Sequence, residues 1–81
     1  MAKMRVLSGR GDTILEWDER RVRTGDPEAQ AAVREAERIF EEQRRRGASA
    51  FRVDGDQPAV RIDQFDPSAK QIIIIPRVAG G

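Results

Sequence analysis

Lys70-Gln71-Ile72-Ile73-Ile74-Ile75-Pro76-Arg77-Val78-Ala79-Gly80-Gly81 joins the most strand-prone part of this chain to its least constrained part. Four consecutive isoleucines favour a β-strand, because branching at Cβ is well accommodated on a pleated, packed surface. The unbroken apolar run indicates apolar neighbours on both faces of that strand. Pro76 lacks a ladder donor and is expected to end the pairing. The terminal glycines have no Cβ, so we expect a rigid strand followed by a slim tail over 76–81.

The residues before this stretch predict four more strands and one long helix. Alternation of apolar and polar residues places strands at 3–7, 13–17, 50–54 and 59–65, and the charged stretch 18–25 is predicted to be a surface loop. A helix is predicted over 27–46, with Asp26 as the N-cap, Pro27 in the first turn and Gly47 just past the end. Its apolar residues recur at intervals of three and four and form one stripe, namely Ala29, Ala32, Val33, Ala36, Ile39 and Phe40.

The predicted order of elements is β-β-α-β-β-β, which places the chain in the α+β class. A helix with one apolar stripe covers one face of one mixed sheet, and the first and last strands form its natural central pair. We expect one domain over 1–75 and a tail over 76–81. The predicted helix-side core contains two of the four isoleucines and the following residues: Val6, Leu15, Trp17, Val33, Ala36, Ile39, Phe40, Phe51, Val53, Val60 and Ile62.

The isoleucine strand implies an apolar surface, because a sheet with one covering helix has one open face. Either Ile72 and Ile74 or Ile73 and Ile75 must lie on that face, and Ile14 is expected near them. A contiguous apolar patch on a small domain often marks a partner-binding surface. The alternative interpretation is partial cover by loops and arginine side chains, and both remain open.

Composition argues against a self-sufficient enzyme. The 81 residues contain no cysteine, histidine or tyrosine, which removes a thiol nucleophile, the commonest general base, the commonest metal ligand and a phenolic acid. Asp54, Asp56 and Asp63 lack the spacing of a calcium-binding loop, so no metal site is expected. The net charge of +1, from 15 basic and 14 acidic residues, provides no field that attracts nucleic acid or membrane. We expect a cytoplasmic protein that is a monomer or a weak oligomer.

Three consecutive arginines, Arg44, Arg45 and Arg46, end the predicted helix. They lie at the negative end of the helix dipole and are compensated by Glu41 and Glu42, which favours a solvated helix end. The functional alternatives are a phosphate or nucleic-acid patch and, preferably, a docking site for an acidic partner.

The segment from Ile72 to Gly81 resembles the end of the ubiquitin-like proteins that finish in Gly-Gly after a strand and a proline. The small subunit of molybdopterin synthase, the thiamine sulfur carrier and bacterial ubiquitin-like modifiers share this pattern, and phage tail-assembly proteins carry a related stretch. The resemblance implies the β-grasp arrangement, which periodicity alone does not specify. It also implies that partners dock on the open face, at Ile73, Ile75 and Ile14.

The same resemblance implies a carrier or modifier activated at Gly81. An adenylating enzyme of the ubiquitin-activating type would use ATP to convert the terminal carboxylate into an acyl-adenylate, and no cofactor would be bound by this chain itself. Gly81 would then carry a thiocarboxylate or an isopeptide bond, with a conjugating enzyme and an isopeptidase as further partners. The tail residues that would thread into the activating enzyme are Pro76, Arg77, Val78, Ala79 and Gly80. The alternative is a structural or assembly module that uses the open face.

Overall fold

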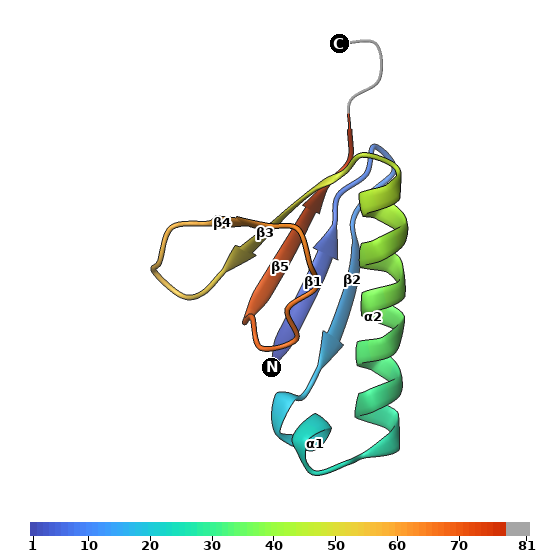
Figure 1. Cartoon of the computed structure of the whole chain (residues 1–81), viewed down its shortest axis with the longest axis vertical. Helices are drawn as coiled ribbons and strands as arrows, with labels where there is room; N and C mark the ends of the chain where they lie inside the picture. The colour runs from blue at the N-terminus through green and yellow to red at the C-terminus, as the bar shows by residue number, and fades with distance from the viewer. Residues whose placement is uncertain (78–81) are drawn as a thin grey trace.

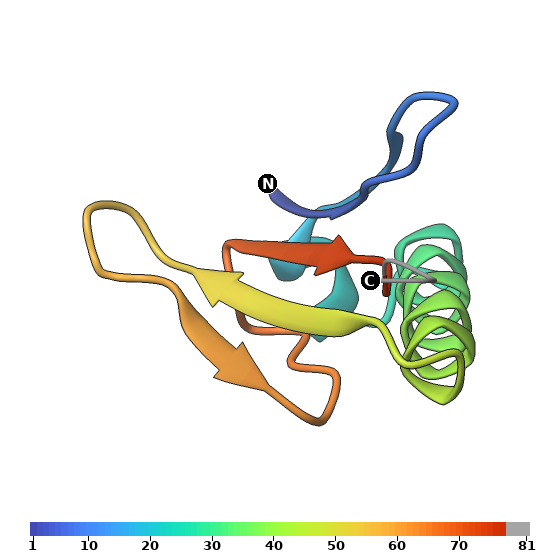
Figure 2. The same ribbon diagram turned by 90° about the horizontal axis from the view of Figure 1, so that it is seen from above.

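The computed structural model describes residues 1–77 and shows one mixed sheet with a long helix across one face (Figures 1 and 2). The strand order is β2-β1-β5-β3-β4. The elements along the chain are β1 (Ala2–Val6), β2 (Thr13–Trp17), α1 (Glu19–Arg23), α2 (Pro27–Arg45), β3 (Ser49–Val53), β4 (Val60–Ile62) and β5 (Gln71–Ile75). The predicted α+β class, with one mixed sheet packed on one long helix, is therefore confirmed.

The ends of α2 are fixed by the residues that the sequence indicated. The Asp26 carboxylate accepts a hydrogen bond from the Ala29 amide at 2.8 Å, and Pro27 follows the cap. At the other end, the Ala48 amide donates to the Gln43 carbonyl at 3.0 Å, and the Gly47 amide donates to the Arg44 carbonyl at 2.9 Å. Gly47 has a φ of +89°, so the helix ends in a Schellman motif that favours glycine at this position.

The isoleucine strand β5 is the middle strand of the sheet. It runs parallel to β1, with Met4 opposite Ile72 and Val6 opposite Ile74, and antiparallel to β3. The predicted central pairing of the first and last strands is therefore confirmed. Because β5 has a hydrogen-bonded strand on each side, it lies inside the sheet, and only its helix-side residues Ile72 and Ile74 are fully buried.

The core lies between the sheet and α2, and it settles which isoleucines face inward. Ile72 and Ile74 are fully buried with Phe40 of α2, whereas Ile73 and Ile75 point to the other side of the sheet. Leu15, Val33, Ile39 and Ile62 pack against this core, as predicted. The predicted core did not include several small residues that are buried in it, namely Ala2, Ala48, Ala50 and Ala69.

The predicted inward residues of β3 were wrong, and of the two predicted for β4 only Ile62 packs against the core. Ala50, not Phe51, is buried on the helix side, because it lies opposite Ile74 in the register with β5. Phe51 and Val53 therefore lie on the open face. Val60 is 57% exposed, since β4 is the edge strand at the far side of β3, and α2 lies closest to β2 and β3.

Two predicted boundaries were also wrong. The stretch 18–25, predicted to be a loop, contains the helix α1, whose N-cap Asp18 accepts a hydrogen bond from the Arg20 amide at 2.9 Å. The strand predicted over 59–65 is limited to β4. Phe65 leaves the sheet, and its ring lies 5.8 Å from that of Trp17 and 5.7 Å from that of Phe40. The loop before β5 thus contributes a large aromatic side chain to the core.

Candidate functional site

The first part of the candidate site is the segment that follows β5. Pairing with β3 ends where Ile75 lies opposite Ser49, and the chain continues through Pro76, which is half-buried, and Arg77, which is exposed. This segment lies at the end of the molecule where α2 also ends (Figure 1). The other predicted tail residues, Val78, Ala79, Gly80 and Gly81, lie outside the described residues.

Arg77 lies against the turn that ends α2. A methyl group added to Gly47 would lie 3.1 Å from Cδ of Arg77 and 3.7 Å from its Cβ. The aliphatic part of the Arg77 side chain therefore packs on the bare backbone at Gly47. This contact joins the first residues after β5 to the end of the helix, and it depends on the glycine that the helix terminus also needs.

The second part of the site is the face of the sheet opposite α2, which we call the open face. Successive cross-strand partners on it form a row across all five strands: Ile14, Arg5, Ile73, Phe51 and Arg61. Ile75 lies on the same face, next to this row. Ile14 and Ile75 are 47% and 43% exposed, so three of the predicted partner-surface residues lie on one surface and two of them are open to solvent.

Arg5 and Phe51 belong to this surface, although the sequence analysis did not select them. The guanidinium of Arg5 lies 3.9 Å from the carboxylate of Asp12, and its Nε atom is buried without a hydrogen-bond partner among the described residues. An incompletely paired guanidinium between Ile14 and Ile73 combines charge with apolar contact area, which is typical of protein-binding surfaces. The alternation of residues 3–7 could have indicated that Arg5 lies on the open face, since it places Arg5 on the other face of the strand from Met4 and Val6.

The three arginines at the end of α2 do not form one patch. Arg44 donates to the Ala48 carbonyl at 2.9 Å and pairs with Asp63 at 3.0 Å, so it ties the helix end to the residues after β4. Arg45 is exposed, and Arg46 is exposed and pairs with Glu42 at 3.0 Å. Two of the guanidinium nitrogens of Arg44 thus have partners within the chain, whereas its Nε atom, like that of Arg5, is buried without a hydrogen-bond partner among the described residues, and its contact with a partner stays a prediction. Arg45 and Arg46 remain accessible.

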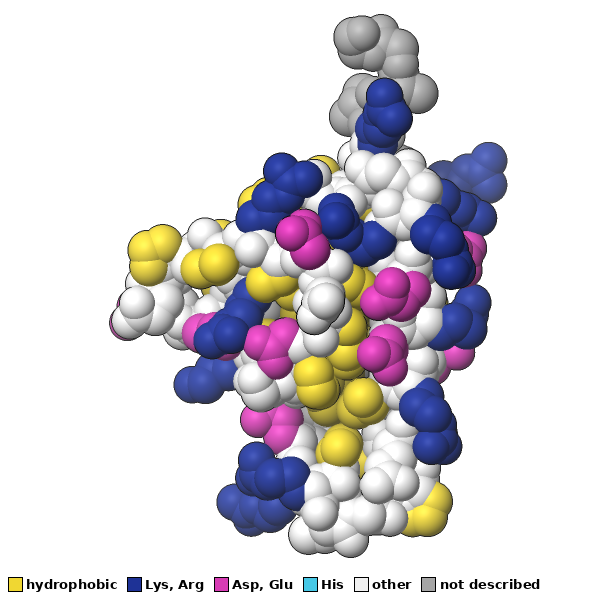
Figure 3. All heavy atoms as spheres, in the orientation of Figure 1, with side chains coloured by type: hydrophobic (Ala, Val, Ile, Leu, Met, Phe, Trp, Pro, Cys, Tyr) yellow, Lys and Arg dark blue, Asp and Glu magenta, His cyan; other side chains and the backbone are white. Residues whose placement is uncertain are grey.

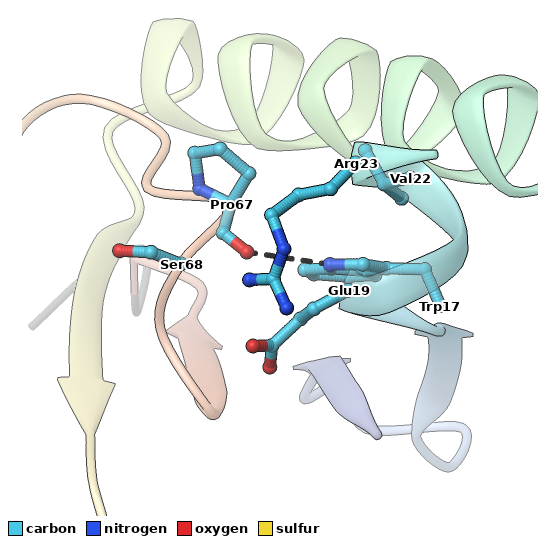
Figure 4. A pocket seen from close by; sticks show the side chains of 6 residues that line it. All are labelled: Trp17, Glu19, Val22, Arg23, Pro67 and Ser68. Atoms are coloured by element: carbon cyan, nitrogen blue, oxygen red, sulfur yellow. Dashed lines mark hydrogen bonds between the residues drawn. The ribbon is translucent and has the colours of Figure 1, made fainter. Parts of the chain in front are cut away.

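A small apolar pocket of about 200 Å³ lies on the helix side, between α1 and the loop before β5 (Figure 4). Trp17, Val22 and Pro67 line it, and Trp17 donates from Nε1 to the Pro67 carbonyl at 3.4 Å. Hydrophobic side chains gather on this side of the molecule between α2 and that loop (Figure 3). Glu19, Arg23 and Ser68 complete the lining of this pocket.

The carboxylates with displaced pKa values are held by structural hydrogen bonds. The Lys70 amide and the Arg52 guanidinium lower the pKa of Asp54, and hydrogen bonds from Ser68 together with Arg52 lower that of Asp66. Arg52 pairs with Asp66 at 2.8 Å and also with Asp54. One arginine of β3 is therefore joined to the loop that follows β3 and to the loop that precedes β5. These shifts favour the ionised carboxylate, which is the opposite of what a general acid at neutral pH requires.

Two kinds of feature are absent from residues 1–77, the part of the chain that the structure describes. Within that range no three acidic side chains approach one another closely enough to bind a metal ion. No helix among these residues is both long enough and apolar enough to cross a lipid bilayer.

Comparison with protein-family models, with curated proteins and with solved structures gave no significant match for this chain. The features of this chain that point to a function are therefore the open face and the segment after β5.

Proposed function

We propose that this chain is a ubiquitin-like β-grasp protein that acts as a protein modifier or a sulfur carrier. The observation that carries the proposal is the position of β5, which lies in the middle of the sheet, parallel to β1, and leads directly into the Pro76–Gly81 sequence. The strand order β2-β1-β5-β3-β4 with α2 on one face supports the proposal, because the β-grasp that the resemblance implies has one mixed sheet, with the first and last strands at its centre, packed on one helix. A central strand is held by two neighbours, so it gives the following segment a rigid origin.

The proposed chemistry takes place at the carboxylate of Gly81. An ionised carboxylate is a poor acyl donor because it has no leaving group. Attack of the carboxylate on the α-phosphorus of ATP releases pyrophosphate and forms an acyl-adenylate. A sulfur or amine nucleophile then displaces AMP and forms a thiocarboxylate, a thioester or an amide. Six residues over 76–81 span at most about 20 Å when extended, which allows entry into a neighbouring active site. This chain is the substrate in these steps, and the adenylating enzyme is the catalyst.

The open face supports the proposal as a docking surface for the adenylating enzyme. Ile73 and Ile75 belong to the strand that leads to Gly81, so a partner bound to them is close to the start of the reactive segment. Ile14 and Arg5 extend this surface across β1 and β2. Arg45 and Arg46 lie at the same end of the molecule as Pro76 and Arg77 and offer charge to an acidic rim of the same partner.

The proposal is tested by ATP–pyrophosphate exchange with adenylating enzymes encoded in the same genome. We expect exchange with the full chain and none when Gly81 is deleted. Gly9→Ala is the matched control, because no atom lies within 4 Å of the added methyl group, and it should leave exchange unchanged. Equal exchange by the Gly81 deletion and the full chain would contradict the proposal.

Mass spectrometry separates the two roles. Trypsin cleaves after Arg77, so a conjugated target would carry Val-Ala-Gly-Gly on the acceptor amine. A sulfur carrier would show sulfur in place of one oxygen of the intact protein.

The second candidate is a non-catalytic assembly module, which the exposure of Ile14 and Ile75 favours. In that case, substitutions on the open face would abolish assembly, and removal of Gly81 would have no effect on it.

A further inference from the structure

We propose that the pocket between α1 and the loop before β5 binds a free α-amino acid with an apolar side chain. This inference concerns a different surface from the proposed function and does not depend on it. The volume of the pocket is about 200 Å³ (Figure 4). Sites for drug-sized ligands have volumes of roughly 300–1,000 Å³, so this pocket suits a ligand with one small apolar group.

The inner surface of the pocket is apolar. Trp17 is buried, Val22 is half-buried, and Pro67 faces them from the loop before β5. The indole Nε1 of Trp17 donates to the Pro67 carbonyl at 3.4 Å, so the polar atom of the ring already has a partner. Transfer of an aliphatic or aromatic side chain from water onto such a surface is favourable in proportion to the apolar area that is buried. The expected occupant is therefore a side chain of the size of leucine or phenylalanine.

One acidic and one basic side chain lie at the rim of this pocket. Glu19 and Arg23 both line it, and both side chains extend from α1 toward the loop that contains Pro67 and Ser68 (Figure 4). They are four residues apart on one helix, which places their Cβ atoms about 5–6 Å apart on one face. Neither side chain takes part in an ion pair with another described residue. Glu19 is half-buried, which strengthens its attraction for a cation because the local dielectric constant is lower than in water.

The two charges at the rim select the class of ligand. The Glu19 carboxylate favours an ammonium group, and the Arg23 guanidinium favours a carboxylate. An α-amino acid has both groups on the carbon atom that bears its side chain. A fatty acid would match Arg23 alone, an aliphatic amine would match Glu19 alone, and an apolar residue within a polypeptide would match neither. Of these four classes, only the free amino acid satisfies the apolar pocket and both rim groups.

The test is an NMR titration of the full, nitrogen-15-labelled chain with L-leucine as the probe. Trp17 is the single tryptophan of the sequence, so its indole Nε1–H gives one resonance that reports on the pocket. A small and open pocket predicts weak binding, and we expect a saturable shift with a dissociation constant on the order of 1 mM. Glycine has both charges but no side chain and should bind about tenfold more weakly. Absence of saturation with L-leucine up to about 20 mM, or equal binding of glycine, overturns the proposal.

Three analogues of leucine test the charged groups. The analogue 4-methylpentanoate lacks the ammonium group and leucinamide lacks the carboxylate, so each should bind about threefold to tenfold more weakly than leucine. N-acetyl-leucinamide lacks both charges and represents a leucine within a polypeptide, so it should bind more weakly still. Equal binding of any of the three and leucine overturns the proposal. In the case of N-acetyl-leucinamide, that result would indicate that the pocket receives a side chain of a partner protein.

Two substitutions at the rim assign the two charges to their residues. Glu19→Gln should weaken the binding of leucine about threefold to tenfold and leave that of 4-methylpentanoate unweakened. Arg23→Gln should weaken the binding of leucine to a similar extent and leave that of leucinamide unweakened. Arg34→Gln is the matched control, because it removes an exposed arginine of α2 that does not line the pocket, and it should change none of these affinities. Wild-type affinity for leucine in either rim variant overturns the proposal.

Discussion

Replacing Gly47 by alanine tests how the end of α2 is joined to the segment that follows β5. Gly47 has a φ of +89°, a conformation that costs an L-residue about 1–2 kcal/mol relative to glycine. The added methyl group would also lie 3.1 Å from Cδ of Arg77, which is closer than ordinary van der Waals contact. The Arg77 side chain is exposed and flexible, so it can move by a few tenths of an ångström at little cost. We therefore expect the free energy of unfolding to fall by about 1–2 kcal/mol.

Urea denaturation and thermal unfolding measure this loss, which corresponds to a decrease in Tm of about 4–16 °C for a domain of this size. Gly25→Ala is the matched control, because its φ is +85° and no atom lies within 4 Å of the new methyl group. The difference between the two variants reports the contact with Arg77. Adding Arg77→Ala to the Gly47→Ala variant should remove the part of the loss that comes from the contact with Arg77. The part that comes from the positive φ at residue 47 should remain. A Gly47→Ala variant as stable as the wild-type protein would refute the reasoning.

Two further predictions concern the loops around the core. Phe65→Ala should lower the free energy of unfolding by about 2–4 kcal/mol, because its ring packs on Trp17 and Phe40. Phe51→Ala, on the open face, should lower the free energy of unfolding by less. Urea titration of both variants measures the two losses. The lowered pKa values of Asp54 and Asp66 contribute stability that is complete above their ordinary value of 3.8 and is lost as the pH falls through the lower folded values. Urea midpoints should therefore decrease below about pH 4, and Asp54→Asn together with Asp66→Asn should flatten that decrease. An unchanged pH profile in the double variant would contradict this assignment.

The candidate site was only partly visible in the sequence. The isoleucine run indicated an open apolar face, and Ile14 was correctly expected to lie on it with one pair of isoleucines. Phe51 was assigned to the core instead, because the alternation of 50–54 contains no information about which face meets the helix. Arg44 was grouped with Arg45 and Arg46 because they are adjacent in sequence. The partner that occupies its guanidinium, Asp63, lies nineteen residues away and becomes a neighbour only in the folded chain.

The sequence by itself determined the features that depend on neighbouring residues. The helix α2 was predicted to within one residue, because its apolar period, its N-cap Asp26 and its terminal glycine are all local signals. The strand at 72–75 and its end at Pro76 were local in the same sense. Only the tertiary structure decided which residues of β3 face inward, since that choice depends on pairing with β5, where Ala50 meets Ile74. It likewise decided that Phe65 belongs to the core, because the space that its ring fills is bounded by Trp17 and Phe40, which are distant along the chain.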